Sequence, residues 1–247
     1  MKKILAVLVN YGEDQLQYLQ QVVSELKSFK KYEVTIFVNS NIPLNNIEGI
    51  DYVNVIKLDD YQLLPLTCKQ VIWNYKDDFD VFLFGENDHL FKEHHIDNHL
   101  HYTQILPENR IAGLIQYEEN ELGKYYPAYH ASYDWEMGSV EEYEGIKFAH
   151  FTNIHQATFI ITKEQLHKIG KLHNFTEFFG HSHYSVKCKV NTDIYQFCGM
   201  KKLICISDFY NNIIHHLPNF YINGDNGRPS FSSPDQKMRN KLNMLLT

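Results

Sequence analysis

The sequence predicts an α/β fold with a mostly parallel central sheet flanked by helices. Apolar, β-rich segments recur along the first part of the chain, at 4–9, 33–39, 53–58 and 81–85. Segments with apolar residues at helical spacing separate several of them. This alternation implies right-handed crossover connections between strands that run in the same direction.

The first strand and the first helix show this pattern clearly. Residues 4–9 are apolar at every position, as in a strand that helices cover on both faces. Gly12 follows this strand and is expected to end it. The segment 13–29 has two acids at its start and lysines near its end, an arrangement that the helix dipole favours.

The rest of the chain is interpreted from the same two patterns, apolar β-rich segments and apolar residues at helical spacing. Residues 118–150 show neither pattern and are rich in tyrosine, which is typical of a binding loop or lid. At the end of the chain, Ser233 is expected to cap a helix, with Pro234 at the first helical position and Gln236 completing a capping box. Further strands are expected at 110–117, 151–162 and 202–206, and further helices at 63–75, 93–105, 163–170 and 191–198.

Composition limits the classes of protein to which the chain can belong. Its 247 residues are 44% hydrophobic, which is enough for one large core, so we expect a single domain. The formal charge of −7 has the wrong sign for binding nucleic acid through its phosphates. Four cysteines without a Cys-x-x-Cys pair do not make a disulfide scaffold, and no segment has the roughly 18 apolar residues of a membrane span. We therefore expect a cytoplasmic protein.

The strand at 81–85 is followed by two carboxylates. Glu86 and Asp88 are two residues apart, so in extended backbone their side chains would point to the same side. Ligands of open α/β sheets bind outside the carboxyl ends of the strands, and Mg²⁺ and Mn²⁺ prefer oxygen ligands. The pair therefore suits a cation that holds a diphosphate. The alternative is that Asp88 caps the helix near Glu93 while Glu86 is solvated.

Three strand ends resemble those of nucleotide-sugar glycosyltransferases of the GT-A type, which have a Rossmann-like fold. They are Asn10-Tyr11-Gly12, Asn39-Ser40-Asn41 and Glu86-Asn87-Asp88, the last in the place of the family's Asp-x-Asp motif. The resemblance implies that Asp88 holds the divalent cation on the donor diphosphate, and that Glu86 contacts a water on the metal or the ribose. The implied donor-binding residues are Val9, Asn10, Tyr11, Gly12, Asn39, Lys69, Glu86, Asn87 and Asp88.

The resemblance also implies a catalytic base and a further metal ligand. Asp193 opens a late helix, where inverting members carry the base that deprotonates the acceptor hydroxyl. His215 or His216 follows the last strand, where many members supply a histidine to the metal. Both roles have an alternative. Asp193 can occur in a first helical turn because the helix dipole alone favours an acid there. His215 or His216 can be a polar surface residue of a loop with no ligand.

Aromatic residues supply the candidates for acceptor binding. They are Tyr126, Tyr129 and Trp135, together with Gln156. Aromatic faces fit the apolar C–H patch of a sugar ring, while their polar tips can hydrogen-bond hydroxyl groups. Packing of the same rings against the sheet is the alternative.

A histidine cluster at 94–101 suggests zinc. His95 and His99 are four residues apart and would share a helical face, a spacing that occurs in zinc sites. The cysteines offer no further ligands at a matching spacing. A solvated helix face is therefore the favoured interpretation.

These observations predict a metal-dependent, hexosyltransferase-like enzyme that uses Mn²⁺ or Mg²⁺. It would move a sugar from a nucleotide-diphosphate sugar, with a UDP-sugar as the favoured donor, to a carbohydrate or lipid-linked acceptor. Bacterial surface polysaccharide synthesis would be its setting, with peripheral association at the inner face of the membrane as one option. Within the one domain 1–247, we expect a nucleotide-sugar-binding half at 1–118, an acceptor-binding half at 119–220, and a tail and helix at 221–247. A zinc hydrolase that uses the 94–101 histidines and a non-catalytic nucleotide-sugar-binding module stay open as alternatives.

Overall fold

The chain forms two compact units that alternate along the sequence. The computed structural model describes residues 1–126, 134–153, 158–177, 186–196, 198–222 and 233–247. The first unit comprises Met1–Ile96 and His155–Gly199, and the second comprises Asp97–Ile154 and Met200–Thr247. These boundaries differ from the expected division at residue 118, and the single-domain organisation stays a prediction.

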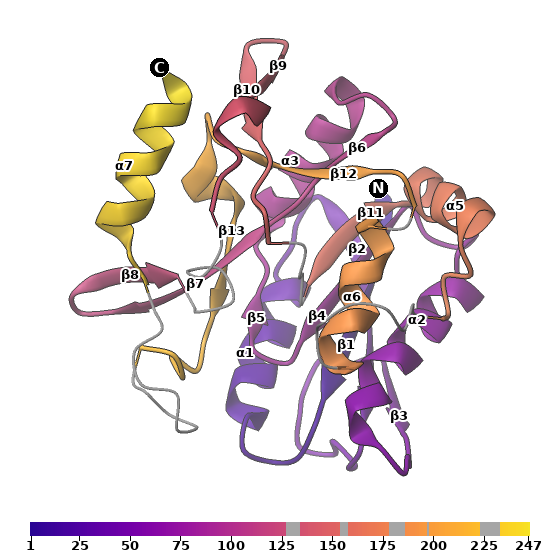
Figure 1. Cartoon of the computed structure of the whole chain (residues 1–247). Helices are drawn as coiled ribbons and strands as arrows, with labels where there is room; N and C mark the ends of the chain where they lie inside the picture. Colours follow the sequence, from indigo (N-terminus) through magenta and orange to yellow (C-terminus); the bar gives the residue numbers. More distant parts are fainter. Residues whose placement is uncertain (127–133, 154–157, 178–185, 197, 223–232) are drawn as a thin grey trace. The chain divides into compact units, whose positions relative to one another are not determined.

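The first unit is built on a five-stranded sheet with the order β11-β4-β1-β2-β3 (Figure 1). β1 (Lys2–Asn10) pairs in parallel with β2 (Tyr32–Ser40) and with β4 (Val81–Glu86). β3 (Tyr52–Val55) extends the parallel part, whereas β11 (Phe159–Thr162) pairs antiparallel with β4. The sheet is therefore mixed, with parallel pairing everywhere except at one edge.

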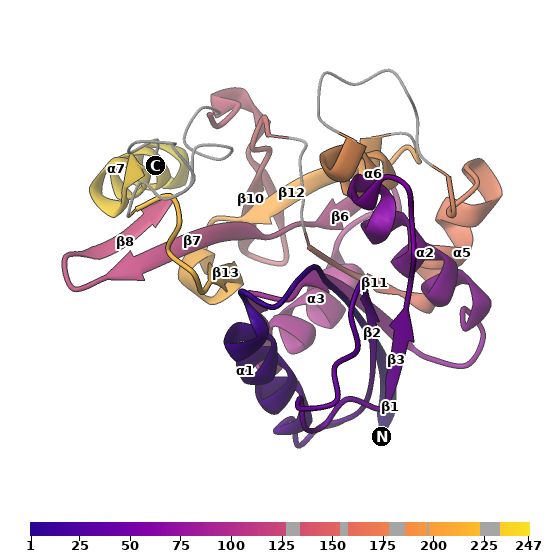
Figure 2. The same ribbon diagram turned by 90° about the horizontal axis from the view of Figure 1, so that it is seen from below.

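Helices cover both faces of this sheet. The chain passes from β1 through α1 (Leu16–Lys27) to β2 in one direction along the sheet, and from β3 through α2 (Leu64–Asn74) to β4 in the other. Right-handed crossovers then place the two helices on opposite faces, as Figure 2 shows. Every residue of β1 from Ile4 to Val9 is consequently buried, as its apolar sequence predicts.

Most other elements of the first unit lie near their predicted positions. α5 begins with a capping box in which Thr162 and Gln165 bond to each other's backbone N–H groups. α6 begins at Val186 rather than at residue 191. α3 crosses the boundary between the units along the chain and has its predicted bounds. The elements are η1 (Tyr61–Leu63), β5 (His89–Leu90), α3 (Glu93–Ile105), α5 (Lys163–Leu172) and α6 (Val186–Gln196).

The second unit contains two small groups of strands with the orders β6-β12-β10-β9 and β14-β8-β7-β13. β6 pairs in parallel with β12, and β7 pairs in parallel with β13, while the other pairs are antiparallel. Among the described residues, no helix is long and apolar enough to cross a membrane. The elements are β6 (Arg110–Ala112), β7 (Ile115–Asn120), β8 (Gly123–Tyr126), η2 (Met137–Ser139), β9 (Glu141–Tyr143), β10 (Ile146–Ala149), β12 (Lys201–Cys205), η3 (Phe209–Asn212), β13 (Ile213–His216), β14 (Ser233–Pro234) and α7 (Asp235–Leu246).

The prediction that 118–150 lacks regular structure is wrong for the described part of that segment. β7 and β8 form one hairpin, and β9 and β10 form another. The second hairpin turns at Glu144 and Gly145, which have φ angles of 51° and 80°. Positive φ at both central residues is what a two-residue hairpin turn of type I′ requires.

The predicted strand at 110–117 is divided into β6 and β7 at Gly113. A Cβ atom at Gly113 would lie 2.5 Å from Cγ and Cδ of Lys202. Glycine therefore leaves room for this lysine, whose Nζ donates to the backbone oxygen of Asn153 at 2.8 Å. Burial lowers the pKa of Lys202 to about 7.

The predicted cap of the C-terminal helix is also wrong. Ser233 and Pro234 form β14, which pairs with β8. α7 begins after them, and within the described residues its N-terminus has no side-chain cap hydrogen bond. Pairing with a distant strand thus replaces the local cap. The helix packs into the core of the second unit through Met238, Leu242 and Leu245.

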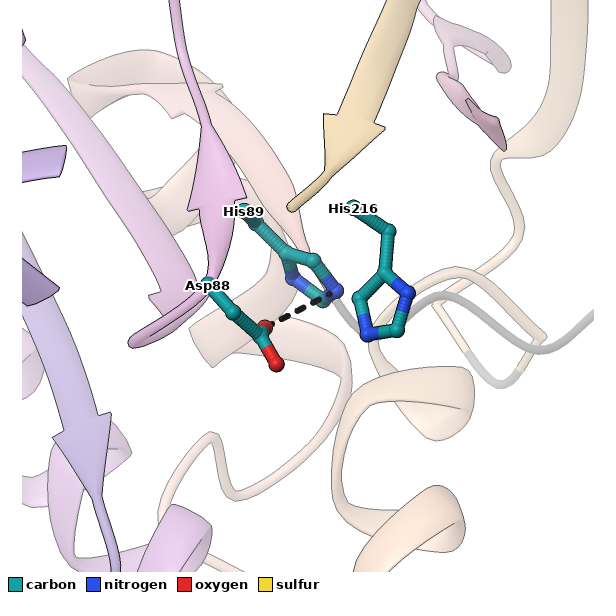
Figure 3. Close-up of side chains that lie close together, drawn as sticks. All are labelled: Asp88, His89 and His216. Carbon is teal, nitrogen blue, oxygen red and sulfur yellow. Dashed lines mark ion pairs between the residues drawn. The ribbon is translucent and has the colours of Figure 1, made fainter. Parts of the chain in front are cut away.

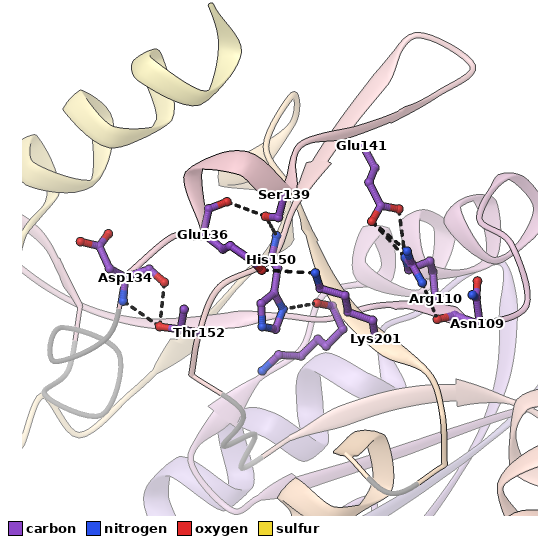
Figure 4. Close-up of polar contacts among 10 residues, drawn as sticks. Asn109, Arg110, Asp134, Glu136, Ser139, Glu141, His150, Thr152 and Lys201 are labelled. Carbon is purple, nitrogen blue, oxygen red and sulfur yellow. Dashed lines mark hydrogen bonds and ion pairs between the residues drawn. The ribbon is translucent and has the colours of Figure 1, made fainter.

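An ion pair ties β6 to β9 in the second unit (Figure 4). Nε of Arg110 lies 2.9 Å from Oε2 of Glu141, and Nη2 lies 3.0 Å from Oε1. The hydroxyl of Tyr143 donates to the same carboxylate at 2.6 Å. Burial acts to raise the pKa of Glu141, but the hydrogen bonds from Arg110 and Tyr143 outweigh it and lower the pKa overall.

Candidate functional site

The strand order of the first sheet changes direction between β1 and β4. From β1 the chain builds outward to β2 and β3, and it then returns to the other side of β1 to form β4. Ligands of open α/β sheets bind outside the carboxyl ends of the strands at such a switch point, because the connecting loops diverge there. Asn10 ends β1 and Glu86 ends β4, so the predicted donor-binding residues lie at this edge.

Buried amides connect three strand ends at the switch point. Nδ2 of Asn87 donates to Oδ1 of Asn10 at 2.7 Å, and Nδ2 of Asn10 donates to the hydroxyl of Ser40 at 3.0 Å. All three residues are buried. Because each group satisfies the next, the network fixes the backbone that follows β1, β2 and β4.

The turn after β1 exposes an aromatic ring. Gly12 has a φ of 72°, in the left-handed region, and its N–H donates to Oδ1 of Asn41 at 2.7 Å. Tyr11 is 63% exposed, and its ring centre lies 5.4 Å from that of Tyr61. The exposed ring of Tyr11 beside the buried amides can stack against a flat ring such as a nucleotide base.

Two of the predicted donor-binding residues are buried inside the first unit. Asn39 is buried, accepts from Nδ2 of Asn54 at 2.9 Å and donates to the hydroxyl of Thr67 at 2.8 Å. Lys69 is also buried, with Nζ 5.7 Å from the ring centre of Phe175. Asn39 therefore supports the end of β2, Lys69 lies beside Phe175 inside the first unit, and donor binding by both stays a prediction.

Asp88 and His89 form a buried pair directly after β4 (Figure 3). Oδ1 of Asp88 lies 3.6 Å from Nε2 of His89. The backbone N–H of Glu86 donates to Nδ1 of His89 at 3.4 Å. When Nδ1 accepts, the proton of a neutral imidazole is on the other nitrogen. His89 therefore presents Nε2–H to the Asp88 carboxylate.

Glu86 forms an ion pair with a lysine of α6. Its Oε2 accepts from Nζ of Lys187 at 2.9 Å, with side-chain exposures of 17% for Glu86 and 49% for Lys187. Sequence reasoning missed Lys187, because nothing in its local sequence links it to the end of β4. The contact of Glu86 with a metal-bound water or with the ribose stays a prediction.

His216 ends β13 in the second unit and faces a fully buried carboxylate. Its Nδ1 lies 2.7 Å from Oε1 of Glu118. An ionised carboxylate can only accept, so Nδ1 carries the proton and Nε2 of the neutral ring carries the lone pair. This is the form in which histidine binds a metal through Nε2.

His215 is held in a different way. Its ring stacks on that of Tyr117, with the centres 4.9 Å apart and the planes at 10°. Burial lowers the pKa of His215. The two adjacent histidines thus have different surroundings within the second unit, a stacked ring for His215 and a carboxylate for His216.

Two of the acceptor-binding candidates lie in the core of the second unit. Tyr126 and Trp135 are 1% and 4% exposed and belong to one hydrophobic cluster. Their placement therefore agrees with packing, the alternative that the sequence left open. Acceptor binding by these residues stays a prediction. Tyr129 and Gln156 lie outside the described residues, as does the side chain of Asp193.

The histidines of α3 do not form the suggested zinc site in the described structure. Within the described parts of the chain, no three potential metal ligands of this helix converge. His95 and His99 are 3% and 5% exposed, so the predicted solvated face is wrong for these two residues. Nδ1 of His95 accepts from the backbone N–H of Lys92 at 3.0 Å, which places the ring at the first turn of the helix.

Comparison with known proteins finds similar structures but no matching family. No protein-family model matches the chain, and no curated protein matches it. The structure is similar to that of S. aureus TarS 1–349, with a TM-score of 0.49 and 10% sequence identity over 89% of this chain and 62% of that one. A second structure of S. aureus TarS has a TM-score of 0.46 and 10% identity, and the match covers 89% of this chain and 37% of that one. The chain therefore spans less than two thirds of either structure.

Proposed function

We propose that the protein is a metal-dependent glycosyltransferase that moves a sugar from a nucleotide-diphosphate sugar to a carbohydrate or lipid-linked acceptor. A UDP-sugar is the favoured donor, and bacterial surface polysaccharide synthesis is the proposed setting. The observation that carries the proposal is the position of Asp88, a buried carboxylate directly after the strand at the switch point. A carboxylate at this edge of an open sheet is suited to hold a cation against a bound diphosphate.

The proposed ligand atoms suit Mn²⁺. They also suit Mg²⁺ if water and phosphate supply more oxygen ligands. Asp88 offers a carboxylate oxygen, and His216 offers an imidazole nitrogen in its metal-binding tautomer. When bound, the cation neutralises the charge that develops on the departing diphosphate. We propose Asp88 and His216 as ligands, with Glu86 contacting a metal-bound water or the ribose.

The remaining residues at the switch point have proposed binding roles. The amides of Asn10 and Asn87 fix the backbone near the donor, and the exposed ring of Tyr11 stacks on the base. Asp193 is the proposed base that takes the proton of the acceptor hydroxyl. These residues position the donor and the acceptor. When a cation supplies the charge stabilisation, positioning is the larger part of the protein's contribution to catalysis.

A panel of nucleotide sugars tests the proposal. UDP-, GDP- and dTDP-sugars, each with and without Mn²⁺, are compared by thermal shift and nucleotide release. A CMP-sugar serves as a matched control, because it has no diphosphate for the cation to hold. At least one diphosphate donor should stabilise the protein only with Mn²⁺, and the CMP-sugar should not. Donor binding that is equally tight without any divalent cation contradicts the proposal.

The same panel separates a transferase from a non-catalytic sugar-binding module. A transferase with bound donor usually releases nucleotide slowly when water replaces the acceptor. A binding module shows the thermal shift without this release. Donor-dependent stabilisation with no nucleotide release, under conditions in which Mn²⁺ is bound, therefore favours the module.

A further inference from the structure

Glu118 is a fully buried carboxylate within β7, and three donor groups of the second unit point at it. Oε1 accepts from Nδ1 of His216 at 2.7 Å. Oε2 accepts from the backbone N–H of Ile222 at 2.8 Å, and the N–H of Tyr221 lies 3.1 Å from Oε2 and 3.2 Å from Oε1. Each oxygen thus has its own partner, and a buried carboxylate with this many donors is held in one orientation.

The segment after His216 is anchored to the same strand. Asn219 has a φ of 55°, and its side chain bonds both backbone groups of Glu119: Oδ1 accepts from the N–H at 3.1 Å, and Nδ2 donates to the oxygen at 2.7 Å. The turn between β13 and Ile222 is therefore fastened at two successive residues of β7. The ring centre of His216 lies 6.2 Å from that of Phe220 and 5.9 Å from that of Tyr221, so two residues of this turn pack near the ring.

We propose that Glu118 is the positioning residue for His216, holding its ring in one orientation with the proton on Nδ1, so that Nε2 is the nitrogen that would bind a divalent cation. This inference rests on the proposed metal-dependent function. Histidine ligands of metals commonly donate their second ring N–H to a carboxylate, which fixes the tautomer and makes the ligating nitrogen more basic. Glu118 acts through His216 and does not itself touch the cation.

The substitution Glu118→Gln separates positioning from folding. With its amide oxygen in the place of Oε2, the glutamine still accepts from the N–H groups of Tyr221 and Ile222, so the turn is retained. The amide NH₂ then replaces Oε1 and donates to Nδ1 of His216. This donor moves the proton of the neutral ring to Nε2 and blocks the ligating atom.

The tautomer of His216 is read directly by ¹⁵N–¹H correlation NMR of the full-length protein at pH 8, where an ordinary imidazole is neutral. The chain has 14 histidines, so the His216 signals are assigned from their loss in His216→Asn. We expect the Nδ1–H form in the wild-type protein and the Nε2–H form in Glu118→Gln. An Nε2–H form in the wild-type protein overturns the inference without any need for a variant.

Mn²⁺ affinity, measured by the EPR signal of the free ion, gives the functional readout. Glu118→Gln should weaken Mn²⁺ binding about 10- to 100-fold, the usual effect of losing the partner of a ligating histidine. Glu119→Gln is the matched control. It removes an equal charge from the next residue, whose carboxylate pairs with Lys124 at 2.9 Å, and should leave the affinity within about twofold.

The outcomes separate this inference from the proposed function. If the wild-type protein binds no Mn²⁺, or if His216→Asn binds it as tightly as the wild type, the proposed metal site fails and the inference fails with it. If binding depends on His216 but Glu118→Gln binds equally tightly, only the inference fails. Equal losses in Glu118→Gln and Glu119→Gln also overturn it, since general electrostatics would then explain both.

Discussion

His89 and His216 are two buried histidines next to strand ends, one in each unit, and the hydrogen bonds at their Nδ1 atoms are opposite. At the end of β4, the backbone N–H of Glu86 donates to Nδ1 of His89. At the end of β13, Nδ1 of His216 itself donates, to the Glu118 carboxylate at 2.7 Å. Exposure does not distinguish the two rings, which are 1% and 6% exposed.

The difference shows that the partner of Nδ1, and not burial, sets what a histidine can do. With Nδ1 as acceptor, His89 carries its proton on Nε2, which lies 3.6 Å from Oδ1 of Asp88. With Nδ1 as donor, His216 keeps a lone pair on Nε2 and can bind a cation. We therefore expect His89 to position Asp88, and we expect His216 to be the proposed metal ligand.

Removing the Asp88 carboxylate should have the largest effect. Asp88→Asn replaces an anionic oxygen with a neutral one and should weaken Mn²⁺-dependent donor binding by more than about a hundredfold, above the usual loss for an outer-shell partner. Isothermal titration with a UDP-sugar in the presence of Mn²⁺ measures this. The circular dichroism spectrum should be unchanged, and full Mn²⁺-dependent turnover by this variant contradicts the central proposal.

Substituting the two histidines in parallel tests the comparison itself. His216→Asn should lower Mn²⁺ affinity about a hundredfold because it removes a ligand, and His89→Asn should lower it about tenfold because it removes only an outer contact. Both are measured by the free Mn²⁺ EPR signal at one pH. Equal losses in the two variants mean that the hydrogen bonds at Nδ1 do not distinguish their roles.

A substitution at Gly85 tests whether the end of β4 before Asp88 is tightly packed. A Cβ atom at this position would lie 2.7 Å from Cε2 of Phe91. The ring is fully buried and has little room to move, so Gly85→Ala should reduce the free energy of unfolding by about 1 to 3 kcal/mol. Urea unfolding measures the change. No loss of stability shows that Phe91 can shift, and that the region around Asp88 is less rigid than the geometry indicates.

Lys202 contrasts with the two histidines, because burial and not a hydrogen-bond partner changes its pKa. Its pKa falls from 10.5 to about 7 in the folded protein, so between these values the unfolded chain binds more protons and stability rises with pH. The stability of the wild-type protein relative to Lys202→Met should therefore increase by up to about 1.4 kcal/mol per pH unit above pH 7. Below pH 7 the difference should level off, because the lysine is then protonated in both states.

Urea unfolding of both proteins at pH 7, 8 and 9 checks this slope. The comparison uses the difference between the two proteins, so other groups that titrate in this range cancel when they are unaffected by the substitution. A difference that stays constant over the range shows that Lys202 keeps its proton when buried. The contact of its Nζ with the backbone oxygen of Asn153 would then be the stronger influence.

The sequence predicts the first unit well because its signals are local. Apolar runs and helical spacing located β1, α1, β2 and α2, and the polar residues after β1 and β4 marked the edge that carries the candidate site. α3 has its predicted bounds. In each case the decisive pattern lies within the element itself.

The second unit is predicted poorly because its strands are paired over long distances. Ser233 reads as a helix cap, yet it pairs with Tyr126 of β8 instead. The β9–β10 turn at Glu144 and Gly145 is a local signal that could have been recognised. The role of Glu118 could not, since it depends on donors about a hundred residues later in the chain.

Pulsed EPR of the Mn²⁺-loaded protein with a bound UDP-sugar tests the central claim most directly. We expect a ³¹P coupling from the donor diphosphate together with a ¹⁴N coupling from an imidazole. The ¹⁴N coupling should be lost in His216→Asn and retained in His89→Asn. Bound Mn²⁺ that shows no ³¹P coupling while the donor is also bound would contradict the claim that the cation holds the donor diphosphate.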